Sequence, residues 1–385
     1  MKFLKNLFKS KPKIYCDRKA ECAAKAFKLQ ELPLNHDANK AEMLWIRKGY
    51  RALMPLLAPN QLINHFPNEG AVINKGYLTQ TLKAYQELGE DKEVSIDDLY
   101  PESYCLYEPE DRKRFFDQLP KVDSRDNIWI YKPGNNSRGR GIEIMWRTGK
   151  LRKKYGNLKD QFISSKDEQG IIQRYIKNPM LLNERKSEIR VYWLLASLNP
   201  LRVLLFDEGT VRLNSLPYQL DQFDNQLIHV TNVYQQYKHP DFDPSVVLKW
   251  SFAELDRYLL AQKKVTDEHF TKNILMPKLK KYLAFVAKAG RKGFNKKYPE
   301  QGECFGVYGA DVILDDQLNP NISEIQKGPG LSFSDPIKKN IIPPMLGEAA
   351  RIMFEIREAR INNKPLPDLK NRDRYQWVIN EAANL

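Results

Sequence analysis

The chain has 385 residues, 42% of them hydrophobic and 11% aromatic, which is enough for a large core and two or three folded domains. This composition excludes a disordered protein, and no apolar run reaches the roughly 20 residues of a membrane-spanning helix. The formal charge of +14 favours acidic partners, but no zinc-finger spacing or RNA-binding motif is present, so nucleic acid is not expected as a partner.

Cysteine usage and the first residues bear on location. The four cysteines show neither metal-ligand spacing nor a disulfide framework, so a reducing compartment, the cytoplasm, is expected. Residues 1–11 place Phe and Leu at helical spacing among lysines. Two interpretations are open: an amphipathic helix that makes weak contact with an anionic membrane, or a frayed terminus with solvated lysines.

The N-terminal part mixes charged and apolar residues at helical spacing. Three prolines interrupt residues 14–60, and the chain turns near 64–67. We therefore expect a small mixed N-terminal domain over 1–70. Lys75 then precedes a helical pattern through Leu78, Leu82 and Tyr85.

A glycine-spaced connection joins two predicted strands within residues 128–146. The first strand ends at Lys132, and residues 134–141 are polar and rich in glycine. This segment is not a P-loop, because Gly-Lys-Ser/Thr is missing and a strand follows it. It is either an ordinary mobile turn or a flap whose N–H groups cover phosphates. Lys132 at its base favours the flap, since a strand lysine suits phosphate binding.

Two further strands carry polar residues. Residues 170–179 form a strand that either offers backbone groups to an adenine edge or belongs to the core. In the strand from Lys186, that residue shares one face with Glu188 and Arg190, as a polar site wall or as a solvent-facing surface. Residues 201–207 and 210–213 are expected as two strands with a turn at 208–209, the second carrying Arg212.

Residues 304–330 predict a β-hairpin with turn chemistry at 315–320. If the turn is centred between Gln317 and Leu318, then Asp311 and Glu324 face each other across the pair. Gln326 shares that face. Two carboxylates beside an amide oxygen make a site for Mg²⁺ with phosphate ligands, whereas the plain alternative is an exposed hairpin with solvated carboxylates.

Taken in order, these motifs resemble the tubulin–tyrosine ligase-like family, a branch of the ATP-grasp superfamily. The resemblance covers about residues 60 to 335 and includes INHFPN, the lysine strand with its flap, QRYI, KSEIR, RVLLFDEGTVRL, HVTN and GADVILDD…NISEI. It implies an α+β ATP-grasp fold, in which two α+β lobes grip ATP between antiparallel sheets. The expected domains are 1–70, a central lobe with the flap over 71–176, and a C-terminal lobe with the metal site over 177–385.

The resemblance also implies a function. A member of this family is an ATP-dependent carboxylate–amine ligase that adds tyrosine, glutamate or glycine to a protein acceptor, with an acidic protein, tubulin, expected here. The free amino acid is its other substrate. The reaction passes through an acyl-phosphate and releases ADP and phosphate, with ATP and Mg²⁺ as cofactors. Such chemistry depends on positioning and charge neutralisation, and needs no Ser, Cys or His nucleophile.

The resemblance also implies site residues, which are found by matching the motifs of this sequence to those of the family. The residues implied to bind ATP are Lys75, Lys132, Gly139, Gly141, Gln173, Arg174, Tyr175, Ile176 and Lys186. The implied catalytic residues, which hold the acyl-phosphate or a substrate carboxylate, are Arg190 and Arg212. The implied substrate neighbours are Glu188, Thr231 and Asn232, and the implied metal ligands are Asp311, Glu324 and Gln326.

Two positions depart from the family pattern. Gln326 stands where the family usually has Asn, and Glu188 where it usually has Asp. Because Mg²⁺ is strict about geometry, these changes bear on efficiency and substrate choice. Two alternatives therefore stay open: a catalytically weakened nucleotide- or tubulin-binding module, and a ligase that acts on another acceptor.

Overall fold

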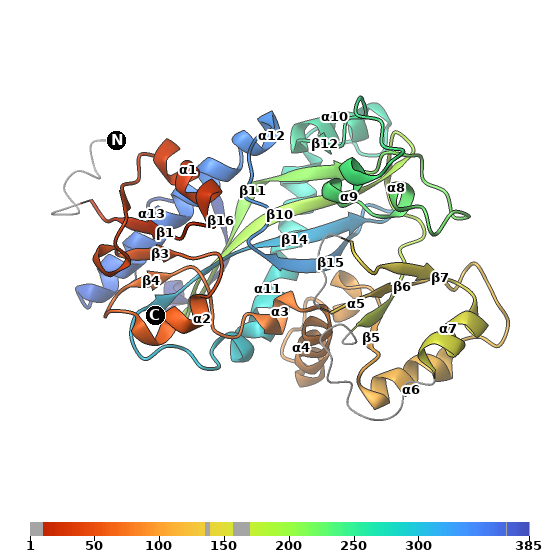
Figure 1. Cartoon of the computed structure of the whole chain (residues 1–385), viewed down its shortest axis with the longest axis horizontal. Coiled ribbons are helices and arrows are strands. Elements are labelled where there is room, and N and C mark those ends of the chain that lie inside the picture. Colours follow the sequence, from red (N-terminus) through yellow and green to blue (C-terminus); the bar gives the residue numbers. More distant parts are fainter. Residues whose placement is uncertain (1–10, 135–138, 157–169, 367, 385) are drawn as a thin grey trace.

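A computed structural model describes residues 11–134, 139–156, 170–366 and 368–384. Helices pack against three separate sheets, and two of these sheets are antiparallel, so the α+β prediction is confirmed (Figure 1). Residues 1–10 of the predicted N-terminal segment and 135–138 of the predicted flap lie outside the described residues. No helix in the described ranges is both long and apolar enough to cross a bilayer.

The N-terminal sheet is short and parallel. Its strands run in the order β13–β4–β3–β1–β2, so the distant strand β13 joins its edge. Helices α1 and α13 share a hydrophobic core with its strands. The strands are β1 (Ile14–Cys16), β2 (Leu34–Asn35), β3 (Met43–Trp45), β4 (Leu62–Ile63) and β13 (Glu303–Cys304), and the helices are α1 (Glu21–Leu29), α2 (Tyr50–Leu53) and α3 (Gly70–Ile73).

A second sheet of four antiparallel strands, in the order β5–β8–β6–β7, carries the flap connection between β6 and β7. Helices α6 and α7 pack against it around Phe115 and Trp129. The strands are β5 (Ser103–Cys105), β6 (Trp129–Lys132), β7 (Glu143–Met145) and β8 (Ile171–Arg174), and the helices are α4 (Lys75–Leu88), α5 (Ile96–Leu99), α6 (Pro109–Gln118) and α7 (Thr148–Tyr155).

The largest sheet is antiparallel and holds the long strands seen at the centre of Figure 1. Its main order is β12–β11–β10–β14–β15, with β16 on β11 and β9 on β10. The strands are β9 (Leu181–Leu182), β10 (Arg185–Leu198), β11 (Leu201–Leu213), β12 (Lys249–Trp250), β14 (Gly306–Leu314), β15 (Pro320–Lys327) and β16 (Tyr375–Asn380). The helices are α8 (Gln226–His229), α9 (Val233–Lys238), α10 (Phe252–Ala261), α11 (Met276–Phe294), α12 (Pro336–Lys339) and α13 (Ile342–Ile361).

Strand β10 shows how this sheet positions a site. Its odd-numbered residues Ile189, Val191 and Trp193 enter the core formed with α10 and α11. On the other face, Tyr192 and Leu194 pack into the core with α13. The same face carries Glu188 and Arg190 earlier in the strand. One face of a single strand therefore changes from charged to apolar after Arg190, and the charged half forms the site.

One expectation was wrong in this sheet. Residues 208–209 form no turn, because β11 is continuous across them. Gly209 instead permits close packing: a Cβ there would lie 2.6 Å from both the Arg190 carbonyl oxygen and a Phe252 ring carbon. The C-terminal tail contributes β16, which pairs with β11. The domain boundaries at 70/71 and 176/177 stay a prediction.

Candidate functional site

The predicted hairpin brings Asp311 opposite Glu324, but by a different route from the one expected. Near the tip, Leu314 pairs with Pro320 and Ile313 with Asn321, which centres the turn on Gln317. That register alone would place Asp311 opposite Ser323. An irregularity between Asp311 and Val312 absorbs the extra residue on β15 and shifts the pairing by one. The opposition of the two carboxylates thus depends on a β-bulge.

Three oxygen-bearing side chains meet on this hairpin. The Gln326 Nε2 atom donates to Asp311 Oδ2 at 3.3 Å and also to Glu324 Oε1. Two carboxylates and one amide oxygen on neighbouring strands fit Mg²⁺, which binds few protein oxygens when phosphates complete its shell. Within the described ranges, no group of three or more His, Cys, Asp or Glu is arranged for a metal.

Asp311 is fully buried between two guanidinium groups. Arg190 contacts both of its oxygens, the second at 2.7 Å, and the Arg212 Nη2 atom lies 2.5 Å from Oδ1. Burial by itself raises the pKa of Asp311, but Arg190 and Arg212 outweigh it and hold that pKa well below its usual range. The carboxylate is therefore ionised at neutral pH, as a metal ligand must be.

Glu188 ties the arginines to the hairpin. Its Oε2 atom accepts from Arg212 Nη2 at 2.9 Å and from the Thr231 hydroxyl at 2.6 Å, and its Oε1 atom accepts from the Ser323 hydroxyl at 2.8 Å. Both oxygens are thus engaged by protein groups. Glu188 therefore links Arg212, Thr231 and Ser323, and its place beside a substrate stays a prediction.

Lys132 crosses from the flap sheet to the hairpin. Its Nζ atom donates to Gln173 Oε1 at 2.6 Å and to the Ser323 carbonyl oxygen at 3.3 Å. Burial lowers its pKa to about 8, against the opposing effect of Glu324. On the other side, the Lys75 Nζ atom lies 3.1 Å from Glu324 Oε2. Lysines from two different elements therefore contact Glu324, a predicted metal ligand, and its neighbour Ser323.

Lys186 lies in an aromatic and histidine environment. Its Nζ atom donates to the Tyr175 hydroxyl at 3.1 Å and to the His229 carbonyl oxygen at 3.3 Å. Burial lowers its pKa to about 7, which Glu188 opposes and Lys132 reinforces. His229, whose Nδ1 lies 2.9 Å from the Tyr175 hydroxyl, has its pKa lowered to about 4 by burial and Lys186. Its imidazole is therefore neutral at pH 7, and its carbonyl oxygen accepts from Lys186.

Some predicted residues lie apart from this group. Arg174 pairs with Glu102 at 2.8 Å and stacks on Trp129, on the strand face opposite Gln173, so its side chain does not line the site. The Asn232 side chain caps α9 by accepting from the Tyr234 and Gln235 N–H groups. Ile176 is half-buried just past β8.

The base of the flap comes close to the segment before α9. Gly139 and Gly141 both have positive φ, +72° and +73°. A Cβ at Gly139 would lie 2.7 Å from a Val230 methyl carbon. Glycine is needed at 139 for both reasons, since the backbone conformation is left-handed and the approach leaves no room for a side chain.

Sequence reasoning missed several residues. Lys249 pairs directly with Arg212 across β12 and β11, and its Nζ atom lies 2.7 Å from Asp335. Burial lowers the pKa of Lys338 to about 8, helped by Lys249 and by the two site arginines. No sequence signal marks these lysines, because β12 has only two residues and its pairing depends on tertiary packing.

Asn214 and Ser323 were missed as well. Asn214 is fully buried beside Lys186, whose carbonyl oxygen accepts from its N–H, and both polar atoms of its side chain lack a partner among the described residues. Ser323 was not predicted, because the alternation of apolar and polar residues along a strand does not reveal a β-bulge.

Altogether, five cations and three carboxylates meet in the site, an excess of two formal positive charges; the cations are Lys75, Lys132, Lys186, Arg190 and Arg212, and the carboxylates are Glu188, Asp311 and Glu324. Most of these groups are buried, where charge interactions are less screened than in water. Such an excess suits a polyanion that arrives with a divalent cation.

Comparisons with known proteins agree with this chemistry. The sequence model of the Tubulin-tyrosine ligase family matches residues 54–360, which include all of the predicted site residues. A probable alpha-tubulin polyglutamylase of Tetrahymena thermophila is 27% identical over 316 residues, 76% of this chain and 72% of that protein. A probable tubulin polyglutamylase of Caenorhabditis elegans is 28% identical, over 71% of this chain and 63% of that protein. A tubulin glycylase of Tetrahymena thermophila is 25% identical, over 83% of this chain but 30% of its own length.

Proposed function

The chain belongs to the tubulin-tyrosine ligase family and has its ATP-grasp fold, and from this premise we propose that it is an ATP-dependent ligase that adds an amino acid to a protein acceptor. Tubulin is the proposed acceptor, because the similar proteins are named for action on tubulin. The added residue is tyrosine, glutamate or glycine. A cytoplasmic location and weak membrane contact at the N-terminus stay predictions.

The opposition of Asp311 and Glu324, beside lysines from two other elements, is the observation that supports this proposal most. ATP supplies the phosphoryl group that activates a carboxylate as an acyl-phosphate, and Mg²⁺ neutralises its phosphates. Lys75, Lys132 and Lys186 bind the phosphates. Because most of these side chains are held by protein partners before any ligand arrives, little reorganisation is needed during the reaction.

The two arginines act on the reacting carboxylate. Arg190 and Arg212 present planar guanidinium groups from adjacent strands, and this geometry matches a carboxylate or a phosphate. Glu188 fixes Arg212 through the 2.9 Å contact. Lys249, which pairs with Arg212 on the side away from the hairpin, and Lys338, which lies near both arginines, add positive charge where the carboxylate of the incoming amino acid is proposed to bind.

An amino-acid panel tests the proposed function. Purified protein, ATP, Mg²⁺ and tubulin are incubated with single amino acids, and the tubulin is read by intact mass. We expect a mass increase of one or more residues of a single amino acid, with matching ADP release. No mass increase with any amino acid, despite nucleotide binding, would contradict the ligase.

That negative outcome would favour the alternative, a binding module of the same fold. The observation behind this alternative is that the Gln326 amide already contacts both carboxylates, with a side chain one methylene longer than the Asn usual in the family. A ligase acting on another acceptor gives a third pattern: no change in tubulin, but a mass increase on another protein when a cell lysate replaces it.

Gln326→Asn should keep or raise the activity. The shorter amide restores the side chain that is usual in the family and still offers an oxygen to Mg²⁺. Gln326→Leu, which has no oxygen, is the matched control and should lose at least roughly tenfold in kcat. ADP release at saturating ATP measures both variants. A sharp loss in the Asn variant would mean that the longer side chain is required.

ATP affinity should fall as the pH rises above about 7. The Lys186 pKa of about 7 in the free protein means that Lys186 is mostly neutral at pH 8. Bound phosphate favours the cation and raises this pKa, so binding takes up a proton. Titration calorimetry between pH 7.5 and 8.5 should show Kd rising by up to about tenfold, with proton uptake seen in buffers of different ionisation enthalpy.

Lys186→Arg is the control for this pH dependence. Arginine stays charged throughout the range, so the ATP affinity of this variant should depend on pH less steeply than that of the wild type, with the remaining dependence coming from Lys132, whose pKa is about 8. A wild-type Kd that is flat over the same range would contradict the assignment of Lys186 to the phosphates.

A further inference from the structure

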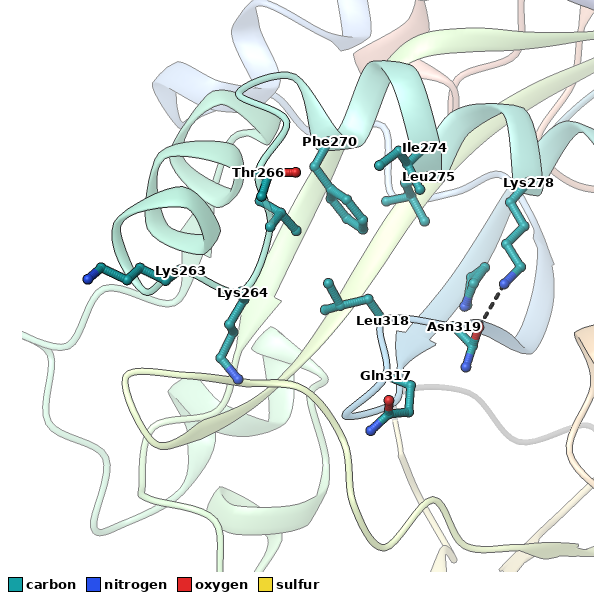
Figure 2. A pocket seen from close by; sticks show the side chains of 12 residues that line it. Lys263, Lys264, Thr266, Phe270, Ile274, Leu275, Lys278, Gln317, Leu318 and Asn319 are labelled. Carbon is teal, nitrogen blue, oxygen red and sulfur yellow. Dashed lines mark hydrogen bonds between the residues drawn. The ribbon is translucent and has the colours of Figure 1, made fainter.

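A hollow of about 400 Å³ lies at the tip of the β14–β15 hairpin, and none of the predicted site residues lines it. Figure 2 shows it between the end of α10, the π-helix Thr271–Leu275 and the hairpin turn. We call it the hairpin-tip pocket. Its lining includes Lys263, Lys264, Phe270, Ile274, Lys278 and Leu318. The pocket borders α10 and α11, which cover the apolar face of the largest sheet. A segment bound in the pocket would therefore not cover the charged face of that sheet.

The pocket combines apolar walls with a cationic rim. Phe270 is buried, whereas Ile274 is 49% exposed although it is a large aliphatic side chain. Lys263 and Lys264 are exposed, and no described residue forms an ion pair with either. Among the described residues, no acidic side chain lines the pocket. An apolar hollow edged by unopposed lysines is complementary to an acidic chain that carries one apolar side chain.

Three unusual backbone features meet at this pocket. Lys263 and Leu318 adopt left-handed conformations, with φ of 54° and 64°, which is costly for residues other than glycine. The turn that bears Leu318 is fixed by Asp315, whose Oδ1 atom accepts from the Gln317 and Asn319 N–H groups at 3.0 and 2.7 Å. The π-helix is the third feature, and π-helical turns are frequent at functional sites. Strained conformations persist where function retains them.

We propose that the hairpin-tip pocket docks an acidic segment of the protein acceptor. One apolar side chain of that segment lies over Ile274 and Leu318, and its carboxylates lie beside Lys263 and Lys264. This inference rests on the proposed function, because the acceptor is an acidic protein. Only two residues of β14, Val312 and Ile313, separate Asp311 from Leu314 at the base of the turn, so the docked segment is held close to the reactive face.

A binding assay tests the docking without requiring turnover. The probe is a fluorescein-labelled glutamate peptide with one central phenylalanine, read by anisotropy. K263E/K264E should weaken its binding by about tenfold. K296E/K297E is the matched control, since it changes the charge equally, both lysines are exposed, and Lys297 is also left-handed, with φ of 61°. Equal weakening by both pairs would mean that only the overall charge matters, and would overturn the site.

Two further comparisons probe the apolar part. A peptide with alanine in place of phenylalanine should bind several-fold more weakly to the wild type, and I274N should remove this difference. Ile274 is exposed enough for the variant to fold, which circular dichroism checks. An oligonucleotide of the same charge that binds as tightly as the phenylalanine peptide would overturn the proposal, because it would show binding of any polyanion.

Turnover separates this inference from the proposed function. With tubulin as acceptor, K263E/K264E should raise KM for tubulin about tenfold and leave KM for ATP unchanged. An unchanged KM for tubulin in an active enzyme would overturn the docking site alone. Specific peptide binding by a protein that ligates no amino acid would support docking and contradict the ligase.

Discussion

Glu324→Gln should lower kcat for amino-acid addition by roughly three orders of magnitude, which is about 4 kcal/mol of transition-state stabilisation. The amide has the size of the carboxylate but no charge, so it removes one of the two carboxylates that face each other on the hairpin and that we propose as Mg²⁺ ligands. It also removes the charge that pairs with Lys75 at 3.1 Å. ADP release and intact mass of the acceptor measure the loss.

The same hairpin provides a control for this variant. Asp316 is exposed in the turn, so Asp316→Asn removes a carboxylate from the hairpin without touching the site and should leave kcat within about twofold of wild type. Both variants should unfold at temperatures close to that of the wild type. A fully active Glu324→Gln protein would remove the basis for the metal site, and with it the main support for the ligase.

Lys132→Met should reduce kcat/KM for ATP by roughly a hundredfold to a thousandfold. Methionine keeps the length of the side chain but cannot neutralise phosphate charge. The fold should survive, because removing a buried cation also removes the cost of burying it. Its two acceptors, Gln173 Oε1 and the Ser323 carbonyl oxygen, lose a donor, so a small change in melting temperature of either sign is expected.

Lys177→Met is the control for Lys132→Met. Lys177 follows the neighbouring strand β8 and forms a partly exposed ion pair with Asp126 at 2.5 Å. Exposed pairs of this kind contribute about 0–1 kcal/mol, so neither activity nor stability should change much. If both lysine variants lost activity equally, the assignment of Lys132 to the phosphates would be wrong.

The bulge at Ser323 connects Glu324 and Lys132, the residues changed in these two predictions. Ser323 bonds Glu188 through its hydroxyl and Lys132 through its carbonyl oxygen, and it precedes Glu324. Ser323 therefore connects three elements: the sheet that carries the flap, the strands that carry Arg190 and Arg212, and the β14–β15 hairpin. Bulges are common next to active sites because they redirect a side chain without breaking the sheet.

The sequence determined the local features of this protein. Alternation in β10 places Glu188 and Arg190 on one face, and turn chemistry at 315–320 produces the hairpin, although the opposition of Asp311 and Glu324 also requires the bulge at Ser323. These features depend on neighbours a few residues apart, where periodicity and turn preferences act. The family and the α+β fold followed from several such motifs in one order.

Only the tertiary structure decided which long-range partners meet. It paired Lys249 with Arg212 through a two-residue strand, turned Arg174 toward Glu102, and used Asn232 as a helix cap. It also kept β11 continuous through Gly209, because Phe252 and the Arg190 backbone pack against that glycine. The pairing of such short strands and the direction of single side chains depend on burial against elements that are distant in sequence, and a local pattern does not contain this information.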